Sequence, residues 1–266
     1  MSGTVLATGF AADALWRRPV IRRLPSARMR NLEKAMTDGF EHFVRPAWRG
    51  LHRLFESFTD PDRFLRRVRG VIHVGANSGP ERHAYARLGL NVLWIEPIPE
   101  VFATLERNIR AYPRQRAVMA LVTDVDGREY DFHVSSNDGL SSSIFDLARH
   151  RELWPEVDYA ATMKIPGTTL PTLLAREGID AAGYQALILD TQGSELLVLR
   201  GAEPVLRGFE YVKTEAADFE SYAGCCLLDE MTAFMASHGF QSISRHRFAG
   251  RAGVGSYYDI VYRRCG

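Results

Sequence analysis

Acidic side chains follow apolar stretches of this sequence at four points, and a glycine-bearing turn follows another apolar stretch. The acids are Glu96, Asp124 (after Thr123), Asp190 and Glu215, and the turn is Gly75-Ala76-Asn77-Ser78-Gly79. Ligands of parallel sheets bind beyond the carboxyl ends of the strands, so this set predicts a ligand site at one sheet edge. A carboxylate there can bind ribose hydroxyls or take a proton from an attacking hydroxyl, although a single strand-end acid is most often a helix cap.

The turn lies in a strand–turn–helix–strand unit between Val71 and Pro97. An apolar strand leads into the turn, Pro80 opens a helix that Gly89 ends, and a second strand ends at Glu96. Glycines let the backbone approach a ligand, and the helix N-terminus offers N–H groups without partners. An acid about 20 residues past the glycines is typical of a nucleoside-cofactor site.

The glycine spacing bears on which nucleoside cofactor the unit binds. Dinucleotide sites prefer G-x-G-x-x-G, whereas this turn has Gly75-x-x-x-Gly79, with Ala76, Asn77 and Ser78 between them. These three side chains would crowd a diphosphate, so the spacing favours S-adenosylmethionine (SAM), which has no phosphate. Two alternatives stay open from the glycines alone. One is an ordinary strand–turn–helix connection, and the other is an NAD(P)-dependent oxidoreductase, although no Tyr-x-x-x-Lys pair accompanies the turn.

Composition narrows the classes of partner. The chain has 266 residues, is 46% hydrophobic and carries a net charge of +1, which argues against a nucleic-acid partner. Its three cysteines have no C-x-x-C spacing, so we expect a reduced, cytoplasmic protein with no cysteine-based metal site. No apolar run approaches the 18 or so residues that a membrane span requires.

Apolar and amphipathic stretches alternate from residue 71 to residue 262. We expect an α/β protein with the Rossmann-like architecture: a mostly parallel, seven-stranded sheet between two helical layers, ending in an antiparallel edge hairpin. Residues 146–165 are expected to hold a helix and an irregular stretch. The expected strands are 71–74, 91–95, 117–122, 129–135 (antiparallel), 186–189, 209–214, 240–244 and 257–262, and the expected helices include 80–88, 99–110, 195–201 and 229–238.

The first 65 residues are predicted to form a basic helical extension before a domain at 66–266. Residues 1–70 contain 14 Lys and Arg against 7 Asp and Glu. From Phe40 to Phe58 apolar residues recur at helical spacing, interrupted at Pro46. This amphipathic stretch could cap the cofactor cleft, form the interface of a homo-oligomer, or simply pack on the sheet.

Asp190 and Glu215 are the candidate catalytic residues. Methyl transfer from SAM is an in-line displacement, so a positioned acceptor and a nearby base account for most of the catalysis. Asp190 could accept the proton of the attacking hydroxyl, and Glu215 could orient the acceptor or share a metal ion with Asp190. A hydroxyl-rich loop, Asn137–Ser143, follows the third strand, where the rim of a cofactor site is expected, and Ser142 is its candidate contact.

Several motifs together resemble the FkbM family of SAM-dependent methyltransferases. The resemblance covers most of the chain, from about residue 71 to residue 262, and its most specific part is D-x-x-G-x-E-x-x-V-L-x-G-A from Asp190. It implies a class I methyltransferase fold, SAM as the methyl donor, and hydroxyl acceptors on sugars or natural products. The matching pieces are VGANSG at 74–79, WIEP at 94–97, LVTDVDG at 121–127, TTLPTLL at 168–174, LILDTQGSELLVLRGAE at 187–203 and VKTEAADF at 212–219.

The resemblance also implies roles for individual residues. Gly75 to Gly79 would line the methionine part of SAM, Glu96 would hold the ribose hydroxyls, and Thr123-Asp124 would flank the adenine. Asp190 and Glu215 would face the transfer site. Two departures stand out: His73 replaces the acid common in the family, and Asp190-Thr191-Gln192-Gly193 replaces D-V-E-G. The second departure removes an acid, so we expect no metal.

The sequence therefore predicts a SAM-dependent O-methyltransferase that acts on a hydroxyl of a sugar or small natural product. A non-catalytic domain that binds SAM is the remaining alternative. It would tolerate the loss of the Asp190 carboxylate, whereas the enzyme would not.

Overall fold

The fold is described from a computed structural model, which describes residues 62–266. The predicted helical extension and its amphipathic stretch fall almost wholly on residues 1–61, outside the described residues, and so does the predicted contact between copies. The boundary at residue 65 stays a prediction. None of the helices in residues 62–266 has the length and apolar character that a membrane crossing requires.

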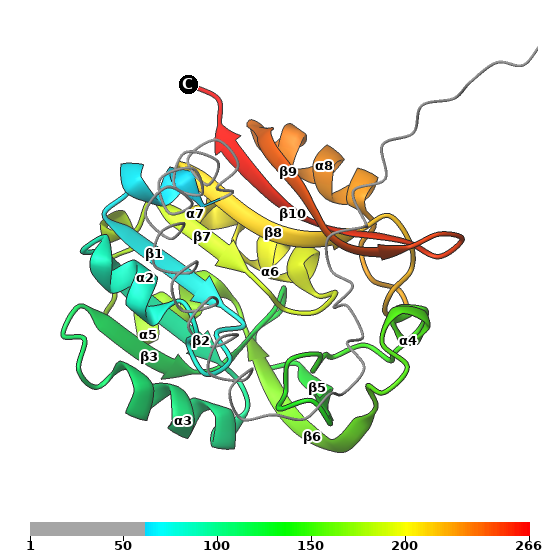
Figure 1. The fold of residues 1–266 in the computed structure, drawn as a ribbon. Helices are drawn as coiled ribbons and strands as arrows, with labels where there is room; N and C mark the ends of the chain where they lie inside the picture. The colour runs from blue at the N-terminus through cyan, green and yellow to red at the C-terminus, as the bar shows by residue number, and fades with distance from the viewer. Residues whose placement is uncertain (1–61) are drawn as a thin grey trace, which may run out of the picture. The chain divides into compact units, whose positions relative to one another are not determined.

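Seven strands form the main sheet, as the sequence predicted (Figure 1). Across the sheet the order is β3 (Gln115–Met119), β2 (Asn91–Glu96), β1 (Gly70–Val74), β7 (Ala186–Leu189), β8 (Tyr211–Ala217), β10 (Gly255–Arg264) and β9 (Phe240–Arg251). The first five of these strands run parallel to one another, and β10 runs antiparallel to both β8 and β9.

Two helical layers cover the sheet, because the strands alternate buried side chains between its two faces. One face, with Ile72 and Leu93, packs against α5 (Leu170–Arg176), α6 (Glu195–Gly201), α7 (Glu203–Leu206) and α8 (Leu228–Ser237). The other face, with Val71 and Trp94, packs against a 3₁₀ helix (Arg63–Arg67), α2 (Arg82–Arg87) and α3 (Pro99–Ile109). The core therefore has two halves, one on each side of the sheet.

The strand predicted at 117–122 is interrupted in the structure. Its first part ends β3 at Met119, and Leu121–Val122 forms a separate short strand, β4. β4 belongs to a second, three-stranded sheet with β5 (Glu129–Ser135) and β6 (Tyr159–Thr168), which lies beside the main sheet (Figure 1). The helix predicted within residues 146–165 is present as α4 (His150–Leu153). The irregular stretch predicted there was wrong, because it holds most of β6, which is largely exposed and has little apolar patterning.

The sheet order reverses direction at β1. The chain first adds β2 and β3 on one side of β1 and then places β7 and β8 on the other side. The loops that leave β1 and β7 therefore diverge at a topological switch point, where open α/β sheets form their ligand crevices. These two loops contain Gly75 and Asp190.

Candidate functional site

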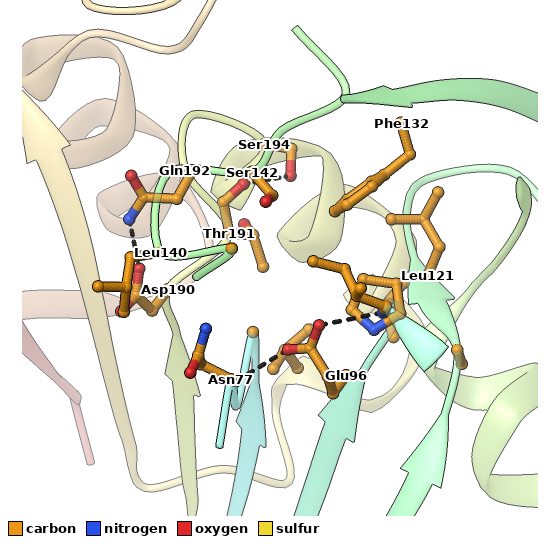
Figure 2. Close-up of a pocket in the computed structure, with 17 residues that line it drawn as sticks. Asn77, Glu96, Leu121, Phe132, Leu140, Ser142, Asp190, Thr191, Gln192 and Ser194 are labelled. Carbon is orange, nitrogen blue, oxygen red and sulfur yellow. Dashed lines mark hydrogen bonds between the residues drawn. The ribbon is translucent and has the colours of Figure 1, made fainter. Parts of the chain in front are cut away.

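A cleft of about 570 Å³ opens at this switch point. Figure 2 shows Asp190 and Gln192 on one side of the cavity, with Glu96, Leu121 and Phe132 on the other. The complete lining is Val74, Gly75, Asn77, Glu96, Pro97, Ile98, Ala120, Leu121, Val122, Phe132, Gly139, Leu140, Ser142, Asp190, Thr191, Gln192 and Ser194.

The glycines of the first turn are required by packing within the protein. Gly75 has φ +81°, and a Cβ atom there would lie 1.8 Å from the backbone oxygen of Asp190. Gly79 has φ +69°, and its Cβ would meet the Leu105 side chain at 2.7 Å. Of the five predicted turn residues, Gly75 and Asn77 line the cleft, whereas Ala76, Ser78 and Gly79 do not.

Glu96 ends β2 and is buried at the floor of the cleft. Its Oε2 accepts a hydrogen bond from the backbone N–H of Asn77 (2.8 Å), and its Oε1 accepts one from the N–H of Ile98 (3.1 Å). Burial raises the pKa of Glu96 to about 7, although both N–H groups favour the charged form. The carboxylate is thus fixed in orientation, with one lone pair of each oxygen left to accept hydroxyl donors from a ligand.

Thr123 and Asp124 lie outside the cleft, contrary to the predicted adenine contact. Thr123 is fully buried below α6, where its carbonyl oxygen lies 2.0 Å from the position of a Cβ on Gly201. Asp124 accepts a hydrogen bond from the Tyr130 hydroxyl (2.9 Å). The break between β3 and β4 explains this difference from the prediction. Residues 120–122, which come just before Thr123 in the chain, line the cleft instead.

Ser142 does line the cleft, in the hydroxyl-rich loop after β5. Its Oγ accepts a hydrogen bond from the Ser135 N–H (3.0 Å) and lies 3.2 Å from the Ser135 hydroxyl. Asn77 ties the same loop to the first turn by donating from Nδ2 to the Asp138 carbonyl (3.1 Å). The loop therefore forms a wall over the cleft that is held mainly by bonds among its own residues.

Gln192 connects the two candidate catalytic acids. Its Nε2 donates to Asp190 Oδ1 (2.6 Å) and lies 3.4 Å from Glu215 Oε2. Its Oε1 accepts a hydrogen bond from the Tyr222 hydroxyl (2.8 Å), which fixes the orientation of the amide. Asp190 directly follows β7, whereas Glu215 lies inside β8, which runs on to Ala217. Asp190 lines the cleft and Glu215 does not.

The loop after β7 is held by Glu195, the first residue of α6. The buried Glu195 carboxylate accepts from the N–H of Thr191 (2.8 Å) and the N–H of Gly193 (3.0 Å). Burial raises the pKa of Glu195 to about 7. These bonds hold Gln192 at φ +51°, a left-handed conformation that costs free energy for a non-glycine residue.

Burial and neighbouring acids raise the pKa values of the carboxyl groups near this loop. Burial, followed by the charges of Asp190 and Glu195, raises the pKa of Glu215 well above its usual range. Asp190 is in contact with solvent, but the protein packed around it raises its pKa, and the Gln192 amide opposes that shift. Among residues 62–266, no three His, Cys, Asp or Glu side chains gather as a metal-binding group.

His73 lies in the middle of β1, away from the cleft. Its ring stacks on Trp94 (centroids 5.1 Å apart), and its Nδ1 is 3.2 Å from the Tyr85 hydroxyl. Burial, aided by the charge of Lys213, lowers the pKa of His73 to about 3. His73 is therefore a neutral, packed side chain, and it is absent from the residues that line the cleft.

The sheet, with one antiparallel strand next to its edge and a crevice at the switch point, has the topology of the class I, Rossmann-like methyltransferase fold. The family model described as the methyltransferase FkbM domain matches residues 73–242. The match covers more than half of the chain, so this chain belongs to the FkbM methyltransferase family. It is a SAM-dependent methyltransferase, and the NAD(P)-dependent alternative was wrong.

Comparison with curated proteins gave no match. Among solved structures, the 1,6-didemethyltoxoflavin-N1-methyltransferase of Burkholderia thailandensis is 12% identical, with a TM-score of 0.44, over 93% of this chain and 94% of that chain. TrmK of M. capricolum is 5% identical, with a TM-score of 0.43, over 77% of this chain and 67% of that chain. Both carry S-adenosylhomocysteine (SAH). At these scores we draw nothing about the acceptor from them.

The residues of the cleft fit SAM. Thr191 Oγ1 is buried in the cleft wall and has no hydrogen-bond partner among the described residues, so a polar ligand group can supply one. Glu96 presents lone pairs suited to ribose hydroxyls, and Leu121 and Phe132 give an apolar surface suited to a purine ring. No lysine or arginine of the described chain lines the cleft, which suits a cofactor without phosphates.

Several residues of the site were not singled out from the sequence as cleft contacts. Gln192 was noticed only as a departure from the family pattern. Its position two residues after Asp190 could have suggested a contact between the amide and that carboxylate. Tyr222 carried no signal, because its partner is 30 residues away in the chain. Ile98, Leu121 and Phe132 are ordinary apolar residues in sequence and acquire a role only from the position of the second sheet.

Proposed function

We propose that this protein transfers the methyl group of SAM to a hydroxyl oxygen of a sugar or a small natural product, with Asp190 as the general base. The observation that carries the proposal is the position of the Asp190 carboxylate. It follows β7 directly, lines the cofactor cleft, and is held 2.6 Å from the Gln192 amide nitrogen at the boundary of that cleft.

A carboxylate at this position suits a hydroxyl acceptor. In methyl transfer the acceptor oxygen forms a bond to the methyl carbon while the carbon–sulfur bond breaks, leaving SAH. The hydroxyl must also lose its proton, and Asp190 accepts it. Its raised pKa makes the carboxylate a stronger base, which favours proton transfer in the transition state. Glu215, linked to Asp190 through Gln192, orients the acceptor.

The cofactor contacts in this proposal are assigned along the cleft. Glu96 receives the ribose hydroxyls, and the unpaired Thr191 hydroxyl and Asn77 contact the methionine part beside Gly75. The other turn residues, Ala76, Ser78 and Gly79, shape the loop from behind. Residues 120–122, Ile98 and Phe132 hold the adenine, taking the role first given to Thr123-Asp124, and Ser142 closes the rim.

The experiment that tests the proposal identifies the methylated atom. The protein is incubated with SAM that carries a ¹³C-labelled methyl group and a panel of methyl glycosides and phenols, together with their amino analogues (methyl aminoglycosides and anilines), and products are followed by NMR. We expect a methyl resonance bonded to oxygen. A product methylated on nitrogen would contradict the proposal, because an amine acceptor reacts through its lone pair and has no need of the Asp190 base. Failure of every panel member to react would count against the assigned acceptor class.

A further inference from the structure

A second cavity of about 270 Å³ lies beyond the cofactor cleft. Gln192 lines both cavities, and Glu215, which is absent from the cofactor cleft, lines the second one. The lining is Gln192, Gly193, Glu195, Glu215, Ala216, Ala217, Ser221, Tyr222, Cys225, Cys226 and Tyr257. The two cavities therefore meet at the residue that joins the two candidate catalytic acids.

The walls of this second cavity are fixed by contacts from distant parts of the chain. Tyr222 donates its hydroxyl to Gln192 Oε1 (2.8 Å), and the Tyr257 hydroxyl lies 2.7 Å from Nδ1 of the buried His150. The His150 ring in turn contacts the Tyr222 ring (centroids 5.1 Å apart). Gly193 packs closely against this wall, since a Cβ atom there would lie 3.1 Å from the Tyr222 ring. The cavity is thus lined by aromatic side chains held by hydrogen bonds, with the Glu215 carboxyl group also in its wall.

The ionisable groups of this wall are neutral or acidic. Among residues 62–266, no lysine, arginine or histidine lines the cavity. Burial raises the pKa of Cys226 to about 12, so its thiol is uncharged at neutral pH. Lys213 is the cation whose charge reaches Glu215, and its ammonium pairs with Asp62 at 2.8 Å. A phosphate or carboxylate placed here would lose its hydration beside two carboxyl groups, with no cationic side chain among the lining residues to compensate its charge.

We infer that this second cavity binds the acceptor, that it takes an uncharged, hydroxyl-bearing ring, and that it rejects phosphorylated or carboxylated forms of the same molecule. The inference rests on the proposed O-methylation and adds the place and charge class of the acceptor. The tyrosine rings supply apolar surface for the faces of a ring, while Glu215 and the Tyr222 hydroxyl supply hydrogen-bonding groups for its hydroxyls.

Gln192 positions the reacting hydroxyl in this arrangement. A glutamate in its place would add another carboxylate next to Asp190 and Glu215, and the amide instead neutralises part of their repulsion by donating to both. The amide also separates the two cavities without adding charge. An uncharged acceptor can therefore approach Asp190 past Gln192.

The first test compares uncharged and anionic acceptors on the wild-type protein. Binding of methyl α-glucopyranoside, methyl α-mannopyranoside, methyl α-rhamnopyranoside and a simple phenol to the SAH complex is measured by ligand-observed NMR, beside the 6-phosphates and uronates of the glucoside and the mannoside. We expect at least one uncharged member to bind about 10-fold or more tightly than its anionic counterpart. Equal or tighter binding of the anionic forms, or binding of no uncharged member, would overturn the inference.

The second test fills the cavity. Cys226→Phe places a ring among the residues that line it, and Cys265→Phe, at an exposed cysteine near the chain end, is the matched control. For Cys226→Phe we expect at least a 10-fold loss of acceptor binding, with SAH stabilising the variant against heat as it does wild type. Should Cys226→Phe fail to fold, the charge comparison on wild-type protein still decides.

The two proposals can fail separately. If labelled methyl appears on oxygen and Cys226→Phe keeps the wild-type KM for that acceptor, the cavity assignment is wrong and the O-methylation stands. If the methyl appears on nitrogen, the proposed function fails whatever Cys226→Phe does.

Discussion

The cofactor cleft and the second cavity are held together in different ways. At the floor of the cleft, Glu96 is fixed by backbone N–H groups of Asn77 and Ile98, and Glu195 holds the loop after β7 in the same manner. In the second cavity, side chains bind side chains across long stretches of sequence: Tyr222 to Gln192 and Tyr257 to His150.

This difference bears on which residues can be replaced without altering the shape of the cleft. A contact between a carboxylate and backbone N–H groups depends only on the acidic residue and on the shape of the turn, and not on the other side chains of that turn. A side-chain pair from two distant segments can be replaced without altering the turn. We therefore expect substitutions of Gly75 and Glu96 to affect folding and cofactor binding, and substitutions in the second cavity to affect the acceptor.

Gly75→Ala should have the largest effect. The new Cβ would lie 1.8 Å from the Asp190 carbonyl oxygen, at a φ of +81° that disfavours alanine, so both loops of the cleft must move. We expect a loss of about 3 kcal/mol or more in the free energy of unfolding, roughly 6–12 °C in midpoint. Gly127→Ala is the control, since φ there is +73° and no atom of the described residues lies within 4 Å of the new Cβ. A similar loss in both variants would show that only backbone strain matters.

Glu96→Gln should weaken SAH binding by about 10-fold or more, because hydrogen bonds to a charged acceptor contribute roughly 1.5–3 kcal/mol. The Gln amide also turns a donor toward one of the N–H groups of Asn77 and Ile98. Calorimetric titration with SAH measures the loss. Unchanged affinity would contradict the assignment of Glu96 to the ribose.

The raised pKa of Glu96 predicts a pH dependence with a definite sign. Below its ordinary pKa of 4.5 the carboxyl group is protonated in both folded and unfolded protein. Between about 4.5 and 7 the unfolded state ionises first, so Glu96 lowers the free energy of unfolding as pH rises, and the effect levels off above 7. Urea unfolding from pH 4.5 to 8 should show a steeper decline in wild type than in Glu96→Gln. Parallel curves would contradict burial as the cause.

The same pKa shift affects ligand binding in the opposite direction. Ribose hydroxyls bind the ionised carboxylate, so SAH affinity should rise with pH up to about 7 in wild type. In Glu96→Gln this rise should be absent. An affinity that falls across this range in wild type would argue that the ligand binds the protonated form.

Tyr222→Phe should have the smallest effect and should separate the two regions. It removes the hydrogen bond that orients Gln192 and leaves the ring in place. We expect about a 3- to 10-fold rise in acceptor KM, equivalent to roughly 1 kcal/mol, with SAH affinity unchanged. Tyr130→Phe, whose hydroxyl binds Asp124 outside both cavities, is the matched control. A loss of SAH affinity in Tyr222→Phe as large as the rise in acceptor KM would mean that the two regions are not separate.

Much of the fold could be predicted from the sequence because the buried strands are short apolar runs ended by glycines or acids. β6 was missed because most of it is exposed, so no hydrophobic alternation marks it. Thr123-Asp124 was misplaced for a related reason: the break after Met119 depends on pairing with β6, a contact made only in three dimensions. Gln192 and Tyr222 needed the same long-range information.

The most direct test of the account measures methyl transfer and cofactor binding on the same samples of wild type, Asp190→Asn and the control Asp180→Asn. Asp180 precedes β7 at its opposite end and caps a short 3₁₀ helix (Ala181–Gly183), which Asn can also do. With the acceptor found by isotope labelling, we predict about a 100-fold or greater fall in single-turnover rate for Asp190→Asn alone, with SAH affinity kept. Wild-type turnover in Asp190→Asn would contradict the role of Asp190 as the base.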